Sequence, residues 1–250
     1  MKLGMMQPYA FPYLGYFQLI HHCDKWVVFD DTQFVRKSWV SRNRILHPEP
    51  AKQWQYVSIP VHHAPLGTMI KDVKIDRDRG WKDAILGKLS SYRQAPRYDD
   101  VRALVASCLD ADRESIAHWN VSALQSVCDY LGINFDYEYS SNLAYDRAAV
   151  THPGQWALET ASYLGASDYV NPAGGHEIFR AAEFSARGLG LRFLRPALKP
   201  YAQGRDGFVA ALSIIDVMMW NRSGQIRDML DAYAIIEHEQ AQAGAPYTQA

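Results

Sequence analysis

Two adjacent carboxylates, Asp30 and Asp31, close the apolar run "KWVVFDD" and are the leading candidates for catalytic residues. A carboxylate that enters a pocket can act as a general base, bind a metal ion or hold a sugar hydroxyl. Because neighbouring residues of a strand point to opposite faces, only one of the two aspartates is expected to enter a pocket. Capping of a turn or a helix remains the alternative role for either carboxylate.

A basic and aromatic segment, "SWVSRNRIL", follows shortly after these aspartates. In a strand, Arg42 and Arg44 share one face and Asn43 lies on the other. A guanidinium fork matches a phosphate or carboxylate, and Arg44 lies closer than Arg42 to the apolar end of the strand, so we expect Arg44 to contact a phosphate group. We expect Trp39 or Tyr9 to stack on a sugar or a base. A solvated hairpin face is the alternative interpretation.

A glycine turn, "YVNPAGG", provides a second polar element that could contact a ligand. Gly174 and Gly175 let the backbone approach a ligand closely, just before a helix whose amino end favours an anion. Without the spacing of a nucleotide-binding fingerprint, an ordinary strand-to-helix turn is an equally good interpretation.

Histidine and cysteine patterns do not predict a metal site. The pairs His21-His22 and His62-His63 are adjacent in sequence, and adjacent residues of a strand or helix do not chelate one ion. The three cysteines are too few and too scattered for a disulfide framework or a zinc site. We therefore expect a reduced, cytoplasmic protein with no bound metal.

The first candidate element is the N-terminal stretch "MMQPYAFPYLGYFQLI". It is interpreted as a strand at Lys2–Met6, a turn that starts at Gln7-Pro8, and a helix from near Pro12 to about His22. Gln7 and the prolines interrupt the apolar run, which argues against a signal peptide or a membrane helix. The turn and helix are expected to form one wall of a pocket, through Gln7, Tyr9, Tyr13 and Tyr16.

The remaining elements alternate between strands and helices. Strands are expected within 25–34, on both sides of a turn at 47–50, at 68–76 and within 133–143. A helix and then a strand are expected within both 152–175 and 176–198, and helices within 206–230, interrupted at 221–224. The expected fold is a single α/β domain over 1–240, with a mostly parallel or mixed sheet and helices on both faces. It includes a β-hairpin insertion and a helical section at about 80–132, and 241–250 are expected to form a disordered tail.

Ligands of such sheets bind outside the carboxyl ends of the strands. Gln7, one of the two aspartates and Gly174 each follow an expected buried strand. We therefore expect them to line one cleft.

The overall composition limits the classes of partner. The chain has 250 residues, 48% of them hydrophobic, and a formal net charge of −1, so a nucleic-acid partner is not expected. It is rich in tyrosine (15) and tryptophan (7), side chains suited to recognising sugars, nucleotides or peptides, although many of them are expected in the core.

The opening "MQPYAFPYLGYFQLI", together with "DKWVVFDDTQF", "SWVSRNRIL", "YVNPAGG" and "LSIIDVMMWNRSG", resembles the WbqC-like family over nearly the whole chain. That resemblance implies a role in polysaccharide, O-antigen or lipopolysaccharide biosynthesis, or in secondary-metabolite biosynthesis. It implies transfer of glycine or another amino-acyl or acyl group to an amino sugar. The substrate would be a small molecule such as a nucleotide sugar. The donor would be a thioester on coenzyme A or on an acyl-carrier protein.

The motif residues that the resemblance implies are Gln7, Tyr9, Pro12, Tyr13, Gly15, Tyr16, Asp30, Asp31, Gln33, Trp39, Asn43, Arg44, Asn171, Pro172, Gly174, Gly175, Tyr201, Gln203, Ser213 and Asp216.

Two alternatives to the transferase remain open. The segment Tyr13-Leu14-Gly15-Tyr16 has the spacing of the His-x-Gly-His element of nucleotidylyltransferases, which favours a nucleotide-binding enzyme. Tyrosines cannot supply the cationic role of those histidines, so adenylyl transfer is not predicted. A non-catalytic binding protein of the same pathway is the third hypothesis.

Overall fold

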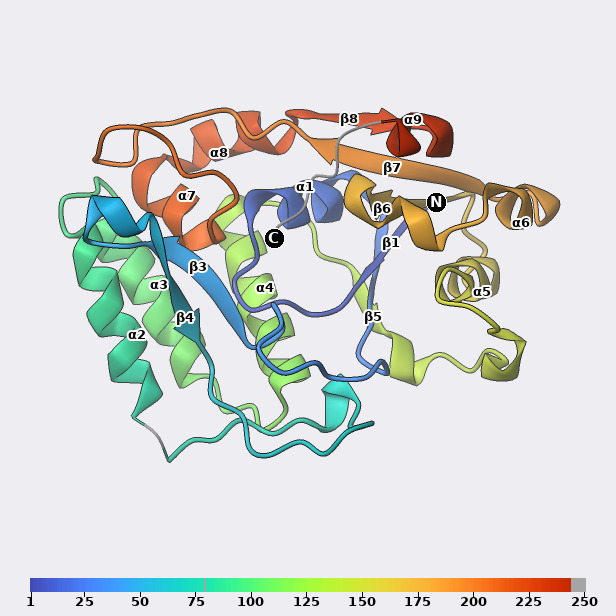
Figure 1. Cartoon of the computed structure of the whole chain (residues 1–250), viewed down its shortest axis with the longest axis horizontal. Coiled ribbons are helices and arrows are strands. Elements are labelled where there is room, and N and C mark those ends of the chain that lie inside the picture. The colour runs from blue at the N-terminus through green and yellow to red at the C-terminus, as the bar shows by residue number, and fades with distance from the viewer. Residues whose placement is uncertain (79, 244–250) are drawn as a thin grey trace.

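A six-stranded mixed sheet forms the centre of the molecule in the computed structural model, which describes residues 1–78 and 80–243 (Figure 1). The strands lie in the order β5-β2-β1-β6-β7-β8, and all neighbours are parallel except β7 and β8. The strands are β1 (Lys2–Met6), β2 (Lys25–Val28), β5 (Tyr137–Tyr139), β6 (Asp168–Pro172), β7 (Gly190–Pro196) and β8 (Tyr233–Ile236). The sheet confirms the expected α/β fold.

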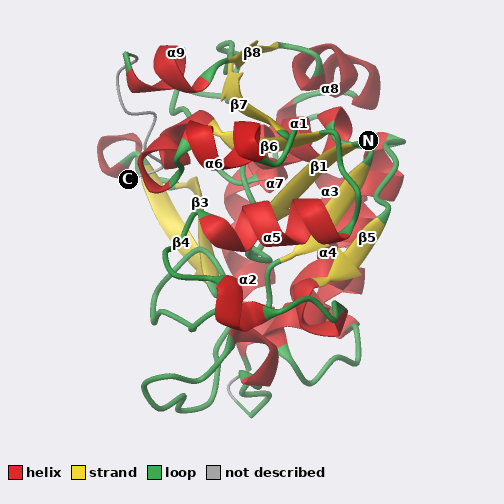
Figure 2. Cartoon of the chain, turned by 90° about the vertical axis from the view of Figure 1, so that its right-hand side faces the viewer, coloured by secondary structure: helices red, strands yellow, loops and turns green. Residues whose placement is uncertain are grey.

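Helices cover both faces of this sheet, because alternate strand residues are apolar on each side. Leu3 and Met5 of β1 belong to one buried cluster, whereas Trp26 and Val28 of β2 belong to the other. Figure 2 shows α5 in front of the strands, and α3 and α4 behind them. The helices are α1 (Leu14–His22), α2 (Trp81–Leu89), α3 (Tyr98–Asp110), α4 (Ile116–Leu131), α5 (Gln155–Tyr163), α6 (Ala181–Ala186), α7 (Ile214–Trp220), α8 (Ser223–Leu230) and α9 (His238–Gln242).

A separate antiparallel hairpin consists of β3 (Arg42–Leu46) and β4 (Trp54–Ser58). It lies beside α7 and the group of helices α2, α3 and α4 (Figure 1). Its own Ile45 and Val57 are buried in the core. The hairpin and the helical section at about 80–132 are both present as expected.

One expected strand, at 68–76, is wrong. Ile70–Asp72 form a 3-10 turn, and this part of the chain makes only isolated bridges. Its backbone amides donate to carbonyls in different parts of the fold: Ile70 to Thr32 at 2.9 Å and Ile75 to Glu114 at 2.9 Å. Alternating apolar residues therefore anchor a loop here instead of pairing in one ladder.

The C-terminal region contains elements that the sequence did not predict. Strand β8 pairs antiparallel with β7, and the helix α9 follows it. The expected disordered tail at 241–250 thus begins within α9, and 244–250 lie outside the described residues.

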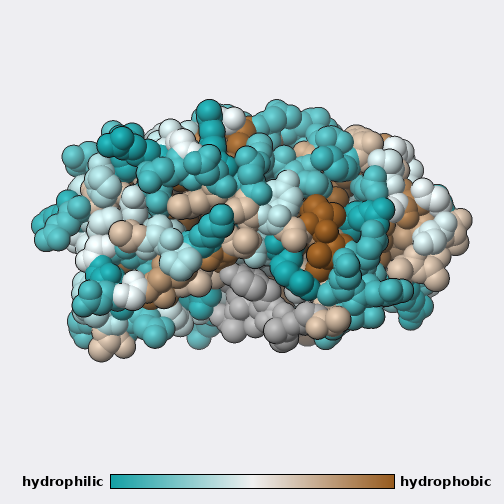
Figure 3. Space-filling model, turned by 90° about the horizontal axis from the view of Figure 1, so that it is seen from above, coloured by the Kyte–Doolittle hydropathy of each residue, from teal (hydrophilic) through white to brown (hydrophobic). Residues whose placement is uncertain are grey.

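The surface seen from above is mainly hydrophilic, and apolar residues gather in small patches between polar ones (Figure 3). No helix within 1–78 and 80–243 is long and apolar enough to cross a membrane.

Candidate functional site

The strand order places a topological switch point between β1 and β6. From β1 the chain continues to β2 and β5 on one side, and later from β6 to β7 and β8 on the other. Loops that leave adjacent parallel strands in opposite directions open a crevice at the carboxyl edge of the sheet, where ligands of α/β proteins bind. The segments that follow Met6 and Pro172 border this crevice.

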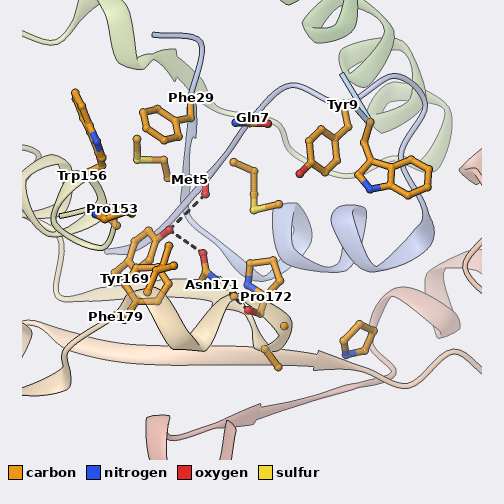
Figure 4. Close-up of a pocket in the computed structure, with 18 of the residues that line it drawn as sticks. Met5, Gln7, Tyr9, Phe29, Pro153, Trp156, Tyr169, Asn171, Pro172 and Phe179 are labelled. Atoms are coloured by element: carbon orange, nitrogen blue, oxygen red, sulfur yellow. Dashed lines mark hydrogen bonds between the residues drawn. The ribbon is translucent and has the colours of Figure 1, made fainter. Parts of the chain in front are cut away.

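A cavity of about 390 Å³ occupies this crevice, and aromatic side chains dominate its wall (Figure 4). Its lining includes Met5, Met6, Gln7, Tyr9, Tyr13, Phe29, Trp39, Pro153, Trp156, Ala157, Tyr169, Asn171, Pro172, Ala173, Gly174, Gly175, Ile178, Phe179 and Pro196. Tyrosines are the only titratable side chains among these described lining residues. The cavity is therefore aromatic and uncharged.

Two side-chain amides give this aromatic wall its polar character. Asn171 lies on β6, where its Oδ1 accepts a hydrogen bond from the Tyr169 hydroxyl at 3.0 Å and its Nδ2 donates to the Pro172 carbonyl at 3.0 Å. The same tyrosine hydroxyl lies 3.4 Å from the Met5 carbonyl oxygen, which links β6 to β1 (Figure 4). No hydrogen bond holds the Gln7 amide within the described chain, so its donor and acceptor are available to a ligand.

The glycine turn after β6 makes room for this arrangement. A Cβ atom at Gly175 would lie 2.6 Å from Asn171 Nδ2, closer than such contacts allow. A side chain at Gly175 would therefore push the amide from its position. Gly15 likewise makes room for the Tyr13 ring, whose hydroxyl would lie 2.7 Å from a Cβ at position 15. Gly15 supports the cavity wall from behind and does not line it.

The loop between β1 and α1 is fixed through its backbone carbonyl groups. The Tyr16 hydroxyl donates to Gln7 O at 2.9 Å, and Asn43 Nδ2 donates to Ala10 O at 3.1 Å. Further bonds run from Asn120 Nδ2 to Pro8 O at 2.8 Å, from Ser213 Oγ to Phe11 O at 2.7 Å, and from the Ile214 amide to Pro12 O at 2.8 Å.

These contacts hold Phe11 at a φ of 41°, a left-handed conformation that costs free energy for a residue with a side chain. Several different elements thus fix the loop, and its opposite side presents Gln7, Tyr9 and Tyr13 to the cavity. A rigid loop positions binding groups before the ligand arrives.

Tyr16 and Asn43 act inside the protein, contrary to the expectation of ligand contact. Tyr16 is 2% exposed and packs against Trp26 with ring centroids 5.1 Å apart. Burial raises the pKa of its hydroxyl well above the usual value. Asn43 is fully buried and also accepts a hydrogen bond from the Arg44 amide at 2.8 Å. Both residues fix the loop and do not line the cavity.

The two aspartates expected to be catalytic join the ends of β2 and β5 and do not line the cavity. Asp30 accepts hydrogen bonds from the Ser141 amide at 3.0 Å and hydroxyl at 2.8 Å. Burial raises the pKa of the Asp30 carboxyl, and the Ser141 hydrogen bonds oppose that rise. Asp31 accepts from Ser140 Oγ at 2.5 Å and pairs with Arg147 at 2.9 Å. The geometry gives both a structural role.

The other expected site residues fall into separate groups. Trp39, Gly174 and Gly175 line the cavity with Gln7, Tyr9, Tyr13 and Asn171. Arg44 lies on β3 beside Trp39, with its guanidinium carbon 5.3 Å from the centre of that ring. Gln33 is exposed and pairs through its backbone with Met69.

Tyr201 and Gln203 belong to a buried network around Asp216, away from the cavity. Asp216 accepts hydrogen bonds from the hydroxyls of Tyr201 at 2.5 Å and Tyr92 at 2.8 Å, and from Gln203 Nε2 at 2.8 Å. Tyr92 in turn accepts from the Leu46 amide at 2.7 Å. The network joins α7 to the hairpin, and its polar atoms are already engaged.

Sequence reasoning missed much of the apolar wall, notably Phe29, Trp156, Tyr169 and Phe179. Phe29 immediately precedes Asp30, and alternation along the strand could have indicated that it faces the cavity side. Trp156 lies in the first turn of α5, after the sequence "HPGQ". No local pattern marks that turn as a cavity wall, because its position depends on how α5 packs.

Among residues 1–78 and 80–243, no group of three or more His, Cys, Asp or Glu side chains is arranged to hold a metal ion.

Comparison with known proteins gives a family and a relative of unknown function. The chain is 26% identical over 239 residues to an uncharacterized protein of Mycobacterium tuberculosis, Rv1507c, covering 92% of this chain and 97% of that protein. No solved structure matches. The profile of the WbqC-like protein family matches residues 7–228, which include the loop after β1, the hairpin and the glycine turn. The chain therefore belongs to the WbqC-like protein family.

Proposed function

We propose that this protein is a transferase that adds an amino-acyl or acyl group, such as glycine, to an amino sugar in polysaccharide or O-antigen biosynthesis. The observation that carries the proposal is the uncharged aromatic cavity at the switch point, with the Gln7 and Asn171 amides on its wall. Aromatic faces pack on the apolar face of a sugar ring, and amides bond to its hydroxyls. A volume of about 390 Å³ is of the size that small-molecule sites have.

An uncharged cavity favours the reactive form of an amino sugar. Burial away from water disfavours an ammonium, so a sugar amine that enters the cavity loses its proton more readily. The neutral amine then attacks the carbonyl carbon of a thioester. The C–N bond forms, the C–S bond breaks, and the leaving thiolate takes up the proton released from nitrogen.

In this reaction the protein acts through position and hydrogen bonding. A fixed loop holds Gln7 in place, and the Gln7 amide N–H groups can donate to the carbonyl oxygen as negative charge develops there. The thioester would be supplied by coenzyme A or by an acyl-carrier protein. Because Asp30 and Asp31 are engaged by Ser141 and Arg147, we assign the base to neither.

A non-catalytic sugar-binding protein is the second candidate. The specific observation in its favour is that the described lining contains no carboxylate, imidazole, amine or thiol that could act as a conventional acid or base. A nucleotidylyltransferase is less well supported, because Tyr16 of the Tyr13-Leu14-Gly15-Tyr16 element is buried in the core.

A product assay separates these candidates. Purified protein is incubated with nucleotide-activated amino sugars and a glycyl or acetyl thioester, and the sugar product is followed by mass spectrometry. The transferase proposal expects an N-acylated sugar that Gln7→Ala reduces strongly. Saturable sugar binding without product would favour the binding protein, and neither binding nor product would contradict both.

A further inference from the structure

The outer face of the hairpin carries two arginines among three aromatic rings. We call it the hairpin face and define it by Trp39, Arg42, Arg44, Trp54 and Tyr56. The guanidinium carbon of Arg42 lies 3.9 Å from the centre of the Tyr56 ring. That of Arg44 lies 5.3 Å from the Trp39 ring and 5.2 Å from the Trp54 ring. Arg44 and Tyr56 are directly opposite in the ladder, which places these side chains on one side.

Neither arginine has a carboxylate partner within the described chain. Other arginines do: Arg147 pairs with Asp31 at 2.9 Å, and Arg187 with Glu159 at 2.6 Å. The Nε atoms of Arg42 and Arg44 are buried and have no acceptor in the part of the chain that the structure describes. Arg44 is half-buried with no acid beside it among the described residues, and this burial lowers the pKa of its guanidinium. Such a pair of cations favours an anionic ligand.

The hairpin face adjoins the cavity through Trp39. This tryptophan lines the cavity, and its ring also contacts the Arg44 guanidinium. A ligand that fills the cavity and extends past Trp39 would therefore reach Arg44, and then Tyr56 and Arg42. Along this path a ligand would meet a sugar-sized cavity, then two cations and the half-buried rings of Trp54 and Tyr56.

We propose that the hairpin face binds the diphosphate of a nucleotide-activated sugar whose sugar ring occupies the cavity. Two guanidinium forks two residues apart can each bond one phosphate group, whereas one carboxylate would use only one of them. Trp54 and Tyr56 then offer surfaces on which the base can stack. This inference rests on the proposed function for the identity of the sugar, but the phosphate site itself can be tested alone.

The test measures the binding of inorganic pyrophosphate, nucleoside diphosphates and free amino sugars by calorimetry. The variants are Arg44→Gln, Arg44→Lys and Arg42→Gln, and the control is Arg102→Gln, an exposed arginine of α3. We expect Arg44→Gln to weaken pyrophosphate and nucleotide binding by about tenfold or more, and Arg42→Gln to weaken it less. Arg44→Lys should lose most of the affinity, since a point charge cannot replace the fork. Arg102→Gln should bind pyrophosphate and nucleotides as the wild type does. None of the arginine variants should change the affinity for the free amino sugar.

Equal pyrophosphate and nucleotide affinity in the wild type, Arg44→Lys and Arg44→Gln would overturn the inference. The arginines would then serve only to stabilise the hairpin through their aromatic contacts. If free-sugar binding that depends on Gln7 persisted in that case, the proposed function would stand without the phosphate site. If the wild type bound pyrophosphate through Arg44 but bound no sugar, the phosphate site would stand and the proposed function would fail. Should Arg44→Gln not fold, Arg44→Lys and Arg42→Gln still decide the question.

Discussion

Two groups of polar residues in this molecule have similar compositions but opposite hydrogen-bonding states. The cavity wall contains Gln7 and Tyr9, whose side-chain polar groups make no hydrogen bond within the described chain and face an open space. The network around Asp216 contains Gln203 and Tyr201, whose polar groups are engaged inside the fold by the Asp216 carboxylate and the Val209 backbone.

Hydrogen-bonding state therefore separates binding residues from structural ones in this molecule. Both groups lie within the part of the chain that the family profile matches, and both consist of tyrosine and amide side chains. A buried polar group must find a partner, so a network that satisfies itself contributes to folding. Polar groups left available on a fixed loop beside a cavity can instead contact a ligand.

The largest expected effect is on stability, from Asp216→Ala. This change leaves the hydroxyls of Tyr92 and Tyr201 and the Gln203 amide without their buried acceptor. We expect a loss of roughly 3–5 kcal/mol in the free energy of unfolding, measured by urea denaturation. The matched control is Asp228→Ala, at an exposed position of α8, which should change it by less than about 0.5 kcal/mol. A small effect of Asp216→Ala would show that the network is not structural.

The same carboxyl group should make stability depend on pH. Burial raises the pKa of Asp216 from 3.8 to about 6, so the folded state holds this proton more tightly than the unfolded state. The contribution of this protonated carboxyl to the free energy of unfolding is fully present below about pH 4 and is lost as the pH rises through about 6. Relative to Asp216→Asn, the free energy of unfolding of the wild type should fall by roughly 3 kcal/mol between pH 4 and 7. Parallel pH profiles of the two proteins would contradict the assignment.

A smaller effect should separate two neighbouring tyrosines. Tyr16→Phe removes the donor to the Gln7 carbonyl and should lower the free energy of unfolding by about 1–2 kcal/mol. Tyr9→Phe should leave stability unchanged and weaken sugar binding about fivefold, the worth of one hydrogen bond. Thermal unfolding and calorimetry on both variants provide the measurement. A reversed result would place Tyr16 at the ligand and Tyr9 in the fold.

The sequence predicted the parts of the fold that depend on local pattern. The strand at Lys2–Met6, the helix that ends at His22 and the hairpin around 47–50 follow from apolar periodicity and from proline and glycine positions. The same reasoning failed at 68–76, where alternating residues anchor a loop through separate long-range hydrogen bonds. An alternation of apolar and polar residues indicates which residues are buried, but not which strand they pair with.

The candidate site was predictable only in part, for a related reason. The positions of Gln7 and Gly174 follow from the rule that ligands bind at the carboxyl ends of strands. The roles of Asp30 and Asp31 could not be predicted, because Ser141 and Arg147 lie more than a hundred residues away and contact them only in the folded chain. Residue type suggests what a side chain can do, whereas its partners decide whether it is available.

Comparing Gln7→Ala with Gln203→Ala shows whether the cavity is the binding site. Both variants replace a glutamine by alanine. Gln7 lines the cavity, whereas Gln203 is 1% exposed and hydrogen-bonded to Asp216 and Val209. Binding of a panel of nucleotide-activated amino sugars is measured by calorimetry, and stability by urea unfolding. We predict that Gln7→Ala weakens binding by about tenfold at unchanged stability, and that Gln203→Ala lowers stability by roughly 2 kcal/mol at unchanged affinity. Unchanged sugar affinity in Gln7→Ala would contradict the claim that this cavity is the binding site.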